Sequence, residues 1–283
     1  MQMRFSSSMK GHTARAYGDN YLSLEDVRRA APAIFAESAH ESRSKRYGFI
    51  PTEKLLSGLM AEGFQPVSVT QANSRAEGKE NAAKHLIRLR HVSTAQVDGV
   101  FPEVVLLNSH DGSSQYKIMA GLFRMVCSNG LICSVGEMDT LSIPHKANAI
   151  DRVIEGSFSI VEKSPAIIDT AHQMANTTLS HEEGIIFSRA ALALRYESEE
   201  TAPINAQRLD NARRREDVGP DLWRTLNRTQ ENLIQGGLRG FTYDANGRQK
   251  RTTTREIKGI DQTVSLNRGL WVLAEEMRKL KAA

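Results

Sequence analysis

The sequence predicts an α+β fold, in which helices pack on an antiparallel β-meander and a basic, helical C-terminal region follows. Three observations support this prediction. Strand-like alternation and hairpin signals fill residues 64–135. Apolar residues with helical spacing dominate before and after that segment. Positive charge is segregated, because residues 201–283 hold 16 Lys and Arg against 10 Asp and Glu while the whole chain carries only +4.

The bulk composition indicates a globular chain. A length of 283 residues and a hydrophobic content of 40% allow one large domain or two small ones. No apolar run approaches the roughly 18 residues that span a bilayer, and residues 1–20 lack the apolar core of a secretory signal. Two cysteines make no disulfide framework, so the cytoplasm is the default compartment. We expect a flexible segment at 1–20, an α+β core at 21–200 and a basic region at 201–283 that docks on it.

Two helices precede the predicted sheet. The Ser23–Asp26 segment has the pattern of a capping box, and the helix behind it would reach about Phe35 with a break at Pro32. A second helix would start at Pro51, show one apolar leucine stripe and end at Gly63.

The sheet is predicted from five β-rich segments and two turns. Asp111-Gly112 and Asn129-Gly130 are dipeptides typical of tight hairpins. The centre of the fourth segment, Met119–Gly121, is also compatible with a helix. The segments are residues 64–71, 85–92, 100–108, 116–126 and 131–135.

Helices dominate the rest of the chain. Residues 147–196 carry helical apolar stripes, and the polar stretch Glu197–Pro203 is the best linker candidate. A further helix would run from Pro220 to Gln235 and end at two glycines. The last helix has apolar residues at 4-3-4-3 spacing, which would pack on the chain's own body or on a neighbouring subunit. Those residues are Leu266, Leu270, Leu273, Met277 and Leu280.

Basic residues cluster in two places within residues 201–283. The first cluster is Arg213, Arg214 and Arg215, which could grip phosphates through bidentate guanidinium contacts. The alternative is a solvated charge run that Glu216 and Asp217 partly neutralise.

The second cluster lies in a Gly-, Arg- and Thr-rich segment, typical of a loop or an exposed hairpin turning at Asn246-Gly247. Such a segment suits sequence-independent phosphate contact, and Phe241 and Tyr243 lie close enough to stack on bases. The alternative is a surface loop without a ligand. The basic residues are Arg248, Lys250, Arg251, Arg255 and Lys258.

Arginines elsewhere widen the candidate surface. Arg224 and Arg228 are spaced i, i+4 on the predicted helix whose Trp223 and leucines form a core-facing stripe. Their polar face would touch a ligand or face water. Arg88 and Arg90 share one face of a predicted strand, which makes either a basic stripe across the sheet or an ordinary exposed strand face.

Catalytic signatures are sparse. The sequence contains no zinc-protease helix motif, no phosphate-binding glycine loop, no nucleophile elbow and no CxxC pair. Cys127 and Cys133 are offset across the Asn129-Gly130 turn, so we expect two reduced, buried cysteines. The His181–Glu183 group lacks a second ligand at metal-binding spacing, and no cofactor is predicted. A non-catalytic role is favoured, although Asp/Glu nuclease sites leave weak local signatures.

Three segments together resemble one family. They are residues 122–134 (LFRMVCSNGLICS), residues 143–156 (IPHKANAIDRVIEG) and the arginine- and tryptophan-bearing region from residue 213 to 277. The combination is similar to the prophage- and plasmid-borne family catalogued as domain of unknown function 932, over roughly residues 45–283. Residence on mobile elements implies DNA transactions or conflict with host defences. The order of helix, twisted hairpin sheet and long helix is also similar in plan to oligomeric single-strand annealing proteins.

Together these features predict a non-catalytic nucleic-acid-binding protein that prefers single-stranded DNA and acts in phage or plasmid recombination or replication. Phosphate neutralisation by Arg and Lys and stacking on bases would supply the binding. Two alternatives remain open: an interaction protein that inhibits a host defence system by binding a host protein, and a nuclease-like enzyme. A homo-oligomer is compatible with each, and no membrane partner is expected.

Overall fold

The computed structural model describes residues 12–16, 20–43, 48–73, 80–124, 130–133, 140–144, 148–196, 199–244 and 246–283. The chain divides into two compact units: unit 1 comprises Met1–Met125 and Ile132–Pro165, and unit 2 comprises Val126–Leu131 and Ala166–Ala283. Helix α3 (Ala149–Ala175) belongs to both units, because the division falls at Pro165 inside it. Within the described ranges, no helix is long and apolar enough to cross a membrane.

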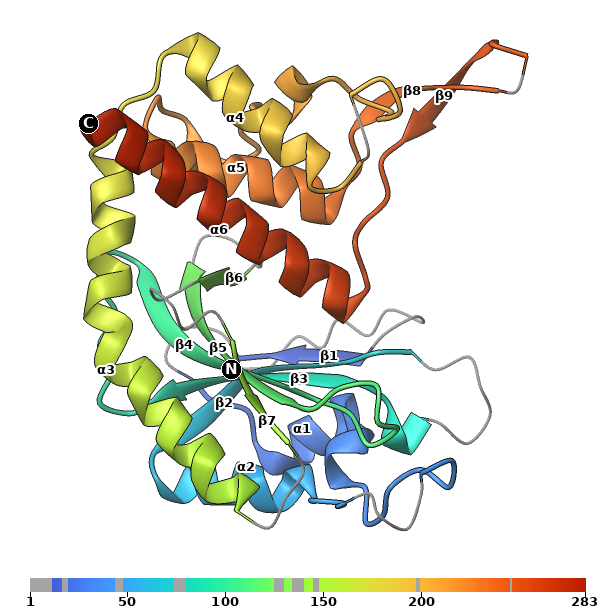
Figure 1. Cartoon of the computed structure of the whole chain (residues 1–283), viewed down its shortest axis with the longest axis vertical. Coiled ribbons are helices and arrows are strands. Elements are labelled where there is room, and N and C mark those ends of the chain that lie inside the picture. The colour runs from blue at the N-terminus through green and yellow to red at the C-terminus, as the bar shows by residue number, and fades with distance from the viewer. Residues whose placement is uncertain are drawn as a thin grey trace. The chain divides into compact units, whose positions relative to one another are not determined.

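An antiparallel sheet forms the centre of unit 1 (Figure 1). The strand order is β1-β2-β3-β4-β5-β6, and β7 also pairs with β5. The pairings from β1 through β5, and that of β5 with β7, are antiparallel, which confirms the predicted meander and the α+β class. The strands are β1 (His12–Arg15), β2 (Phe64–Gln71), β3 (His85–His91), β4 (Val100–Asn108), β5 (Tyr116–Arg124), β6 (Gly130–Cys133) and β7 (Leu141–Ile143).

The strand bounds follow the sequence patterns closely. Strand β4 is a run of β-branched and apolar residues, and all nine of its residues are buried. The Met119–Gly121 stretch, compatible with a helix on sequence grounds, lies in β5. The turn predicted at Asp111-Gly112 is confirmed, because Gly112 has φ +78° and the Ser113 N–H donates to Asp111 Oδ1 at 2.9 Å.

Helices α1 (Leu24–Ala30) and α2 (Thr52–Ala61) pack against β2. The predicted capping box is present, since Ser23 Oγ accepts from the Asp26 N–H at 3.1 Å and Asp26 Oδ2 accepts from the Ser23 N–H at 3.2 Å. Helix α1 is shorter than expected, because Pro32 starts a separate 3₁₀ turn, η1 (Pro32–Phe35).

Strands β5 and β6 are neighbours in the sheet, as the predicted hairpin requires. The residues of the predicted turn that precede Gly130 lie outside the described residues, and so does Cys127. Cys133 is buried, which confirms the expected burial of that cysteine.

Helix α5 (Leu222–Gln235) is the central helix of unit 2 and packs on α4 (His181–Ala193) and α6 (Ile260–Ala282). Asp221 caps its start by accepting from the Arg224 N–H at 2.9 Å, and Gly236 at φ +62° ends it. Two short 3₁₀ turns precede α5: η3 (Ala206–Arg208) and η4 (Arg215–Asp217). Most of α5 is buried, including its polar run Asn227–Asn232.

The aromatic core of unit 2 differs from the prediction. Trp223 is half-buried, and Trp271 of α6 is the tryptophan that is 1% exposed. The apolar stripe predicted for α6 is buried only in its first half: Leu266 and Leu270 are buried, while Leu273 and Met277 are half-buried and Leu280 is 72% exposed. The helix instead buries Val264, Asn267, Trp271 and Ala274 alongside Leu270, because an α-helix repeats every 3.6 residues.

The division into units also differs from the boundary that the sequence suggested near residue 200. Helix α4 precedes that boundary, yet it packs on α5 and α6, which follow it. Of the stretch taken as a linker, Glu197–Pro203, residues 199–203 therefore lie inside unit 2, and residues 197 and 198 lie outside the described residues.

Candidate nucleic-acid interface

A two-stranded hairpin carries the second basic cluster. Strands β8 (Arg239–Tyr243) and β9 (Gln249–Thr253) form a sheet of their own, and Figure 1 shows it extending away from α4, α5 and α6 of the same unit. Eight of the ten strand residues are exposed, and the other two, Gly240 and Thr252, are half-buried. Of the two structures expected here, a loop or an exposed hairpin, the second is present. We call residues 239–253 the β8–β9 arm.

The register of the two strands gives the arm two different faces. Residues opposite each other across a strand pair share a face, and so do alternate residues along a strand. Phe241 lies opposite Arg251, and Tyr243 lies opposite Gln249. One face, which we call the aromatic face, therefore holds Arg239, Phe241, Tyr243, Gln249, Arg251 and Thr253. The other face holds Gly240, Thr242, Lys250 and Thr252.

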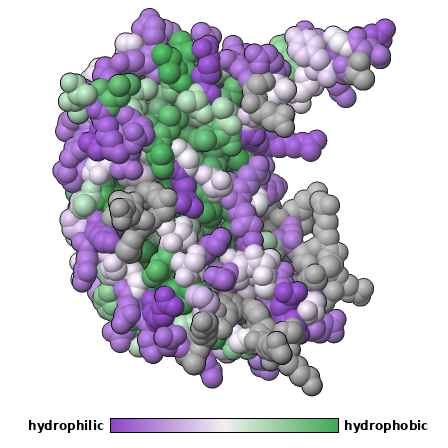
Figure 2. All heavy atoms as spheres, viewed as in Figure 1, coloured by the Kyte–Doolittle hydropathy of each residue, from purple (hydrophilic) through white to green (hydrophobic). Residues whose placement is uncertain are grey.

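The arm and the five residues that follow it concentrate positive charge, most of which has no acidic partner among the described residues. Residues 239–258 contain six basic and two acidic residues, a net charge of +4. Lys258 pairs with Glu256 at 3.5 Å. The other five cations are exposed, and within the described part of the chain their side chains form no ion pair: Arg239, Arg248, Lys250, Arg251 and Arg255. Figure 2 shows a mostly hydrophilic surface over the arm.

At the tip of the arm, Asp244 makes hydrogen bonds to Asn246 and Arg248. Asp244 Oδ1 accepts from the backbone N–H groups of Asn246 and Arg248, each at 2.9 Å. The Asp244 N–H donates to the carbonyl of Arg248 at 3.0 Å, and Gly247 adopts φ +72°. These bonds around Asp244 hold Arg248 directly before β9.

The first basic cluster serves mainly to hold unit 2 together. Arg214 makes a bidentate contact with Glu231, from Nη2 to Oε1 at 2.7 Å and from Nε to Oε2 at 3.2 Å, and the Glu231 side chain is only 3% exposed. Arg213 donates to Asn232 Oδ1 at 2.5 Å and to the carbonyl of Gly236. The expectation of a phosphate-gripping triplet does not fit these two residues, because partners on α5 already engage their guanidinium groups. Arg215 alone of the three is exposed without such a contact among the described residues.

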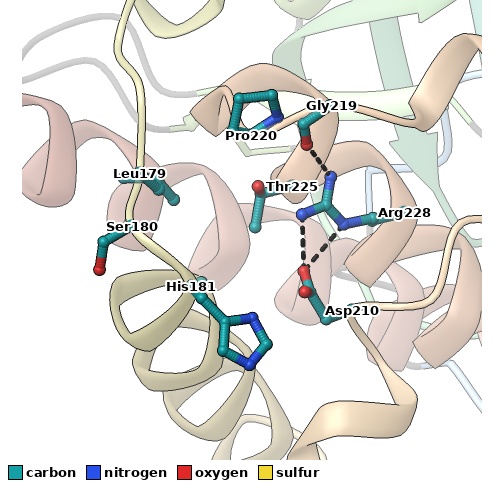
Figure 3. A pocket seen from close by; sticks show the side chains of 9 residues that line it. Leu179, Ser180, His181, Asp210, Gly219, Pro220, Thr225 and Arg228 are labelled. Carbon is teal, nitrogen blue, oxygen red and sulfur yellow. Dashed lines mark hydrogen bonds and ion pairs between the residues drawn. The ribbon is translucent and has the colours of Figure 1, made fainter.

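Arg228 is buried beside a pocket of about 300 Å³ that Ser180, His181 and Thr225 help to line (Figure 3). Its Nε and Nη2 contact Asp210 Oδ1 at 2.8 and 2.7 Å, and its Nη1 donates to the carbonyl of Gly219 at 2.8 Å. All three guanidinium nitrogens are therefore engaged, and Arg228 braces the chain before α5 instead of forming a ligand-facing surface.

Arg224 also has partners within its own unit. Its Nη1 lies 2.6 Å from Asp221 Oδ2, and its Nε donates to the carbonyl of Glu216 at 3.1 Å. Part of its side chain is exposed. Arg224 and Arg228 thus do not form the shared polar face that their i, i+4 spacing suggested.

Arg88 and Arg90 lie in the interior of unit 1, so neither the basic stripe nor the exposed strand face that we considered is present. Arg88 Nη1 contacts Glu103 Oε2 at 2.9 Å, and Arg90 Nε contacts Glu103 Oε1 at 3.0 Å. The Glu103 side chain is 1% exposed, and each arginine side chain is 6% exposed. Arg90 also stacks on Phe101, with Cζ 3.8 Å from the ring centroid. Burial of an ion pair requires such mutual compensation.

Two residues of the aromatic face, Arg239 and Gln249, were not among the residues predicted from the sequence. The available signal was the period-two spacing of Arg239, Phe241 and Tyr243, which is typical of one face of a strand.

Among the residues that the structure describes, no group of three or more His, Cys, Asp or Glu could hold a metal ion.

Comparisons with known proteins agree with the resemblance noted from the sequence. The family model described as "Domain of unknown function (DUF932)" matches residues 39–271. The UPF0380 protein YafZ of Escherichia coli K12 is 41% identical over 262 residues, and the UPF0380 protein YfjQ of the same strain is 40% identical over 262 residues. Each alignment covers 92% of this chain and 92% of the relative. No solved structure matches the chain. The protein therefore belongs to the family named domain of unknown function 932.

Proposed function

We propose that this protein binds nucleic acid through the β8–β9 arm and prefers unpaired strands. The observation that carries the proposal is the aromatic face, on which Arg239 and the exposed Phe241 and Tyr243 occupy alternate positions of β8, with Arg251 opposite Phe241. Arg239 forms no ion pair within the part of the chain that the structure describes. Phe241 is 46% exposed and Tyr243 is 66% exposed. Large rings held in water beside cations are the combination that single-strand binding proteins use.

The geometry of the strand suits an extended single strand. Alternate residues of a β-strand are roughly 7 Å apart, so the two rings can contact different bases of an unstacked strand. Stacking of a base on an aromatic ring contributes about 1–3 kcal/mol, and it needs a base face that a duplex does not expose. Cations on both faces of the arm would contact the phosphates, which carry no sequence information.

The number of basic residues in and just after the arm sets an upper limit on how steeply salt should weaken binding. Six basic residues at positions 239–258 are the candidate phosphate contacts. If every one of them neutralised a phosphate of a single strand, the log–log slope of affinity against salt would be roughly −4. Arg88, Arg90, Arg213, Arg214, Arg224 and Arg228 are not part of this proposed surface, since internal partners engage them.

The test is a salt titration of binding to single-stranded and double-stranded oligonucleotides of equal length. Replacement of Arg248, Lys250 and Arg251 by alanine should reduce the slope by roughly one to three units and weaken binding to all sequences alike. The matched control replaces three exposed cations of unit 1, Arg28, Lys54 and Arg152, and should leave the slope unchanged. Folded wild-type protein that retains no DNA or RNA at low salt and micromolar concentration would contradict the proposal. The host-protein-binding alternative would then lead.

The wider role that we propose is handling of single-stranded DNA in phage or plasmid recombination or replication. Its support is the mobile-element residence that the family resemblance implies, together with the single-strand features of the arm. An annealing assay with complementary strands checks this role separately from binding. Binding without faster annealing would restrict the protein to strand protection or delivery.

A further inference from the structure

The β8–β9 arm is rooted on the end of α5 by a ladder of backbone hydrogen bonds. The Gly237 N–H donates to the carbonyl of Thr254 at 2.7 Å, and the Thr254 N–H donates to the carbonyl of Leu238 at 2.9 Å. Thr254 Oγ1 accepts from the Leu238 N–H at 3.0 Å, and the Ile257 N–H donates to the carbonyl of Ile234 at 2.8 Å. The two segments that lead into and out of the arm are thus hydrogen-bonded to each other from Gly237, the second residue after α5.

Glycines allow the backbone to approach closely at this root. A Cβ at Gly240 would lie 1.8 Å from the carbonyl oxygen of Pro203, which accepts from the Phe241 N–H at 2.8 Å. A Cβ at Gly236 would lie 2.5 Å from the carbonyl carbon of Arg255, and Gly236 has φ +62°. Any side chain at Gly240 would push the arm away from Pro203.

Two arginines join the same root to the body of unit 2. Arg195, just beyond α4, donates through Nη1 to the carbonyl of Leu233 and through Nη2 to the carbonyl of Arg255. Arg213 donates to the carbonyl of Gly236. The last carbonyls of a helix have no intrahelical donor and carry partial negative charge, so a guanidinium is a fitting partner. The Arg195 side chain thus adds a second bridge between the end of α5 and the chain leaving β9, beside the backbone bond from Ile257 to Ile234.

We infer that Arg195 is a positioning residue that holds the β8–β9 arm in one orientation, so that its aromatic face is ready for the nucleic acid. This inference rests on the proposed function of the arm. An isolated two-stranded hairpin is marginally stable in water, so its order must come from its attachment. Without the Arg195 bridge, the backbone ladder alone would hold the arm, so the arm would move more in the free protein and lose more of that motion on binding, which reduces affinity.

A positioning residue and a phosphate-contacting residue differ in a measurable way. Arg195→Gln should raise amide hydrogen exchange in residues 239–253 by about tenfold. It should also weaken single-strand binding by roughly tenfold while leaving the log–log salt slope unchanged, because the phosphate contacts are still made once the arm is bound. The matched control is Arg208→Gln, which removes an exposed cation whose side chain has no hydrogen-bond partner among the described residues. This control should leave the amide hydrogen exchange of the arm and the affinity for single strands at wild-type levels.

Gly240→Ala provides an independent variant, because it disturbs the root at Pro203 and keeps every charge. It should raise arm exchange and weaken binding in the same way as Arg195→Gln. Wild-type exchange of the arm in Arg195→Gln would overturn the inference, whatever Gly240→Ala shows. A reduced salt slope in Arg195→Gln would also overturn it, since that result would make Arg195 a phosphate contact. If wild-type protein binds no oligonucleotide, the proposed function fails, while the exchange measurement still decides whether Arg195 holds the arm.

Discussion

Phe241 and Arg251 lie directly opposite each other on β8 and β9, with the ring and the guanidinium on the same face of an exposed hairpin. The Phe241 N–H donates outward to Pro203, so the two residues form a non-hydrogen-bonded pair, in which Cα atoms are roughly 4.5 Å apart. A base stacked on Phe241 would therefore have its own backbone within reach of Arg251. This one relationship joins the two kinds of contact that single-strand binding needs.

Tyr243 is expected to discriminate between unpaired and paired strands. Tyr243→Ala should weaken single-strand binding by roughly 5- to 100-fold, since one stacking contact is lost, and should change duplex binding by less than about twofold. Fluorescence anisotropy at one fixed salt concentration measures both. Thr242→Ala, on the opposite face of the same strand, is the control. Equal losses for single and double strands would show that Tyr243 does not stack on bases.

Arg214 is expected to stabilise unit 2 and not to contact a ligand. Its removal leaves the buried carboxylate of Glu231 without its bidentate partner, so Arg214→Ala should lower the free energy of unfolding by about 2–3 kcal/mol. Arg215→Ala should change it by less than about 0.5 kcal/mol. Urea titration followed by tryptophan fluorescence reports on unit 2, because both tryptophans, Trp223 and Trp271, lie there. Adding Glu231→Gln to Arg214→Ala should restore part of the lost free energy of unfolding, because the buried carboxylate is removed. A double variant no more stable than Arg214→Ala would argue against the ion pair.

Two leucines of the same sequence stripe on α6 should behave in opposite ways. Leu270 is 0% exposed, so Leu270→Ala should lower the free energy of unfolding by about 2–5 kcal/mol. Leu280 is 72% exposed, and Leu280→Ala should leave that free energy within about 0.5 kcal/mol of wild type. The same tryptophan-monitored titration compares them, with size-exclusion chromatography as a second measurement. A large effect at Leu280, with a change in oligomeric state, would show that this end of α6 packs on a neighbouring subunit.

Glu275 should make stability depend on pH. Partial burial raises the pKa of the Glu275 carboxyl above its usual value of 4.5, and nearby Lys279 and Arg278 offset part of that effect. Because the folded-state pKa exceeds the unfolded one, ionisation of Glu275 disfavours the native state. The free energy of unfolding is therefore highest while Glu275 is protonated, and it falls as pH rises through the folded pKa. Glu275→Gln should therefore be more stable than wild type at pH 7, with a smaller difference at pH 4. Thermal unfolding at the two pH values measures this, and an equal difference at both would contradict it.

Local structure was largely predictable from the sequence because short-range chemistry determines it. The capping box at Ser23 satisfies an amide group of the first turn of α1 with a side chain only three residues away. The bounds of β2 and β4 match the predicted segments because those runs suit strands and end at turn residues. The end of α5 at Gly236 followed from the φ that glycine tolerates.

The candidate site was predictable only in part. The sequence alone determined that positive charge gathers after residue 200 and that the Arg- and Thr-rich segment is exposed. The sequence could not distinguish Arg213 and Arg214, which contact α5, from Arg248 and Arg251, which face water. The reason is that the partner of an arginine can be a residue far away in the sequence. Burial of Arg88 and Arg90 likewise required Glu103 on another strand. Only the tertiary structure decided which charges are compensated inside the protein, since compensation depends on distances in space and not along the sequence.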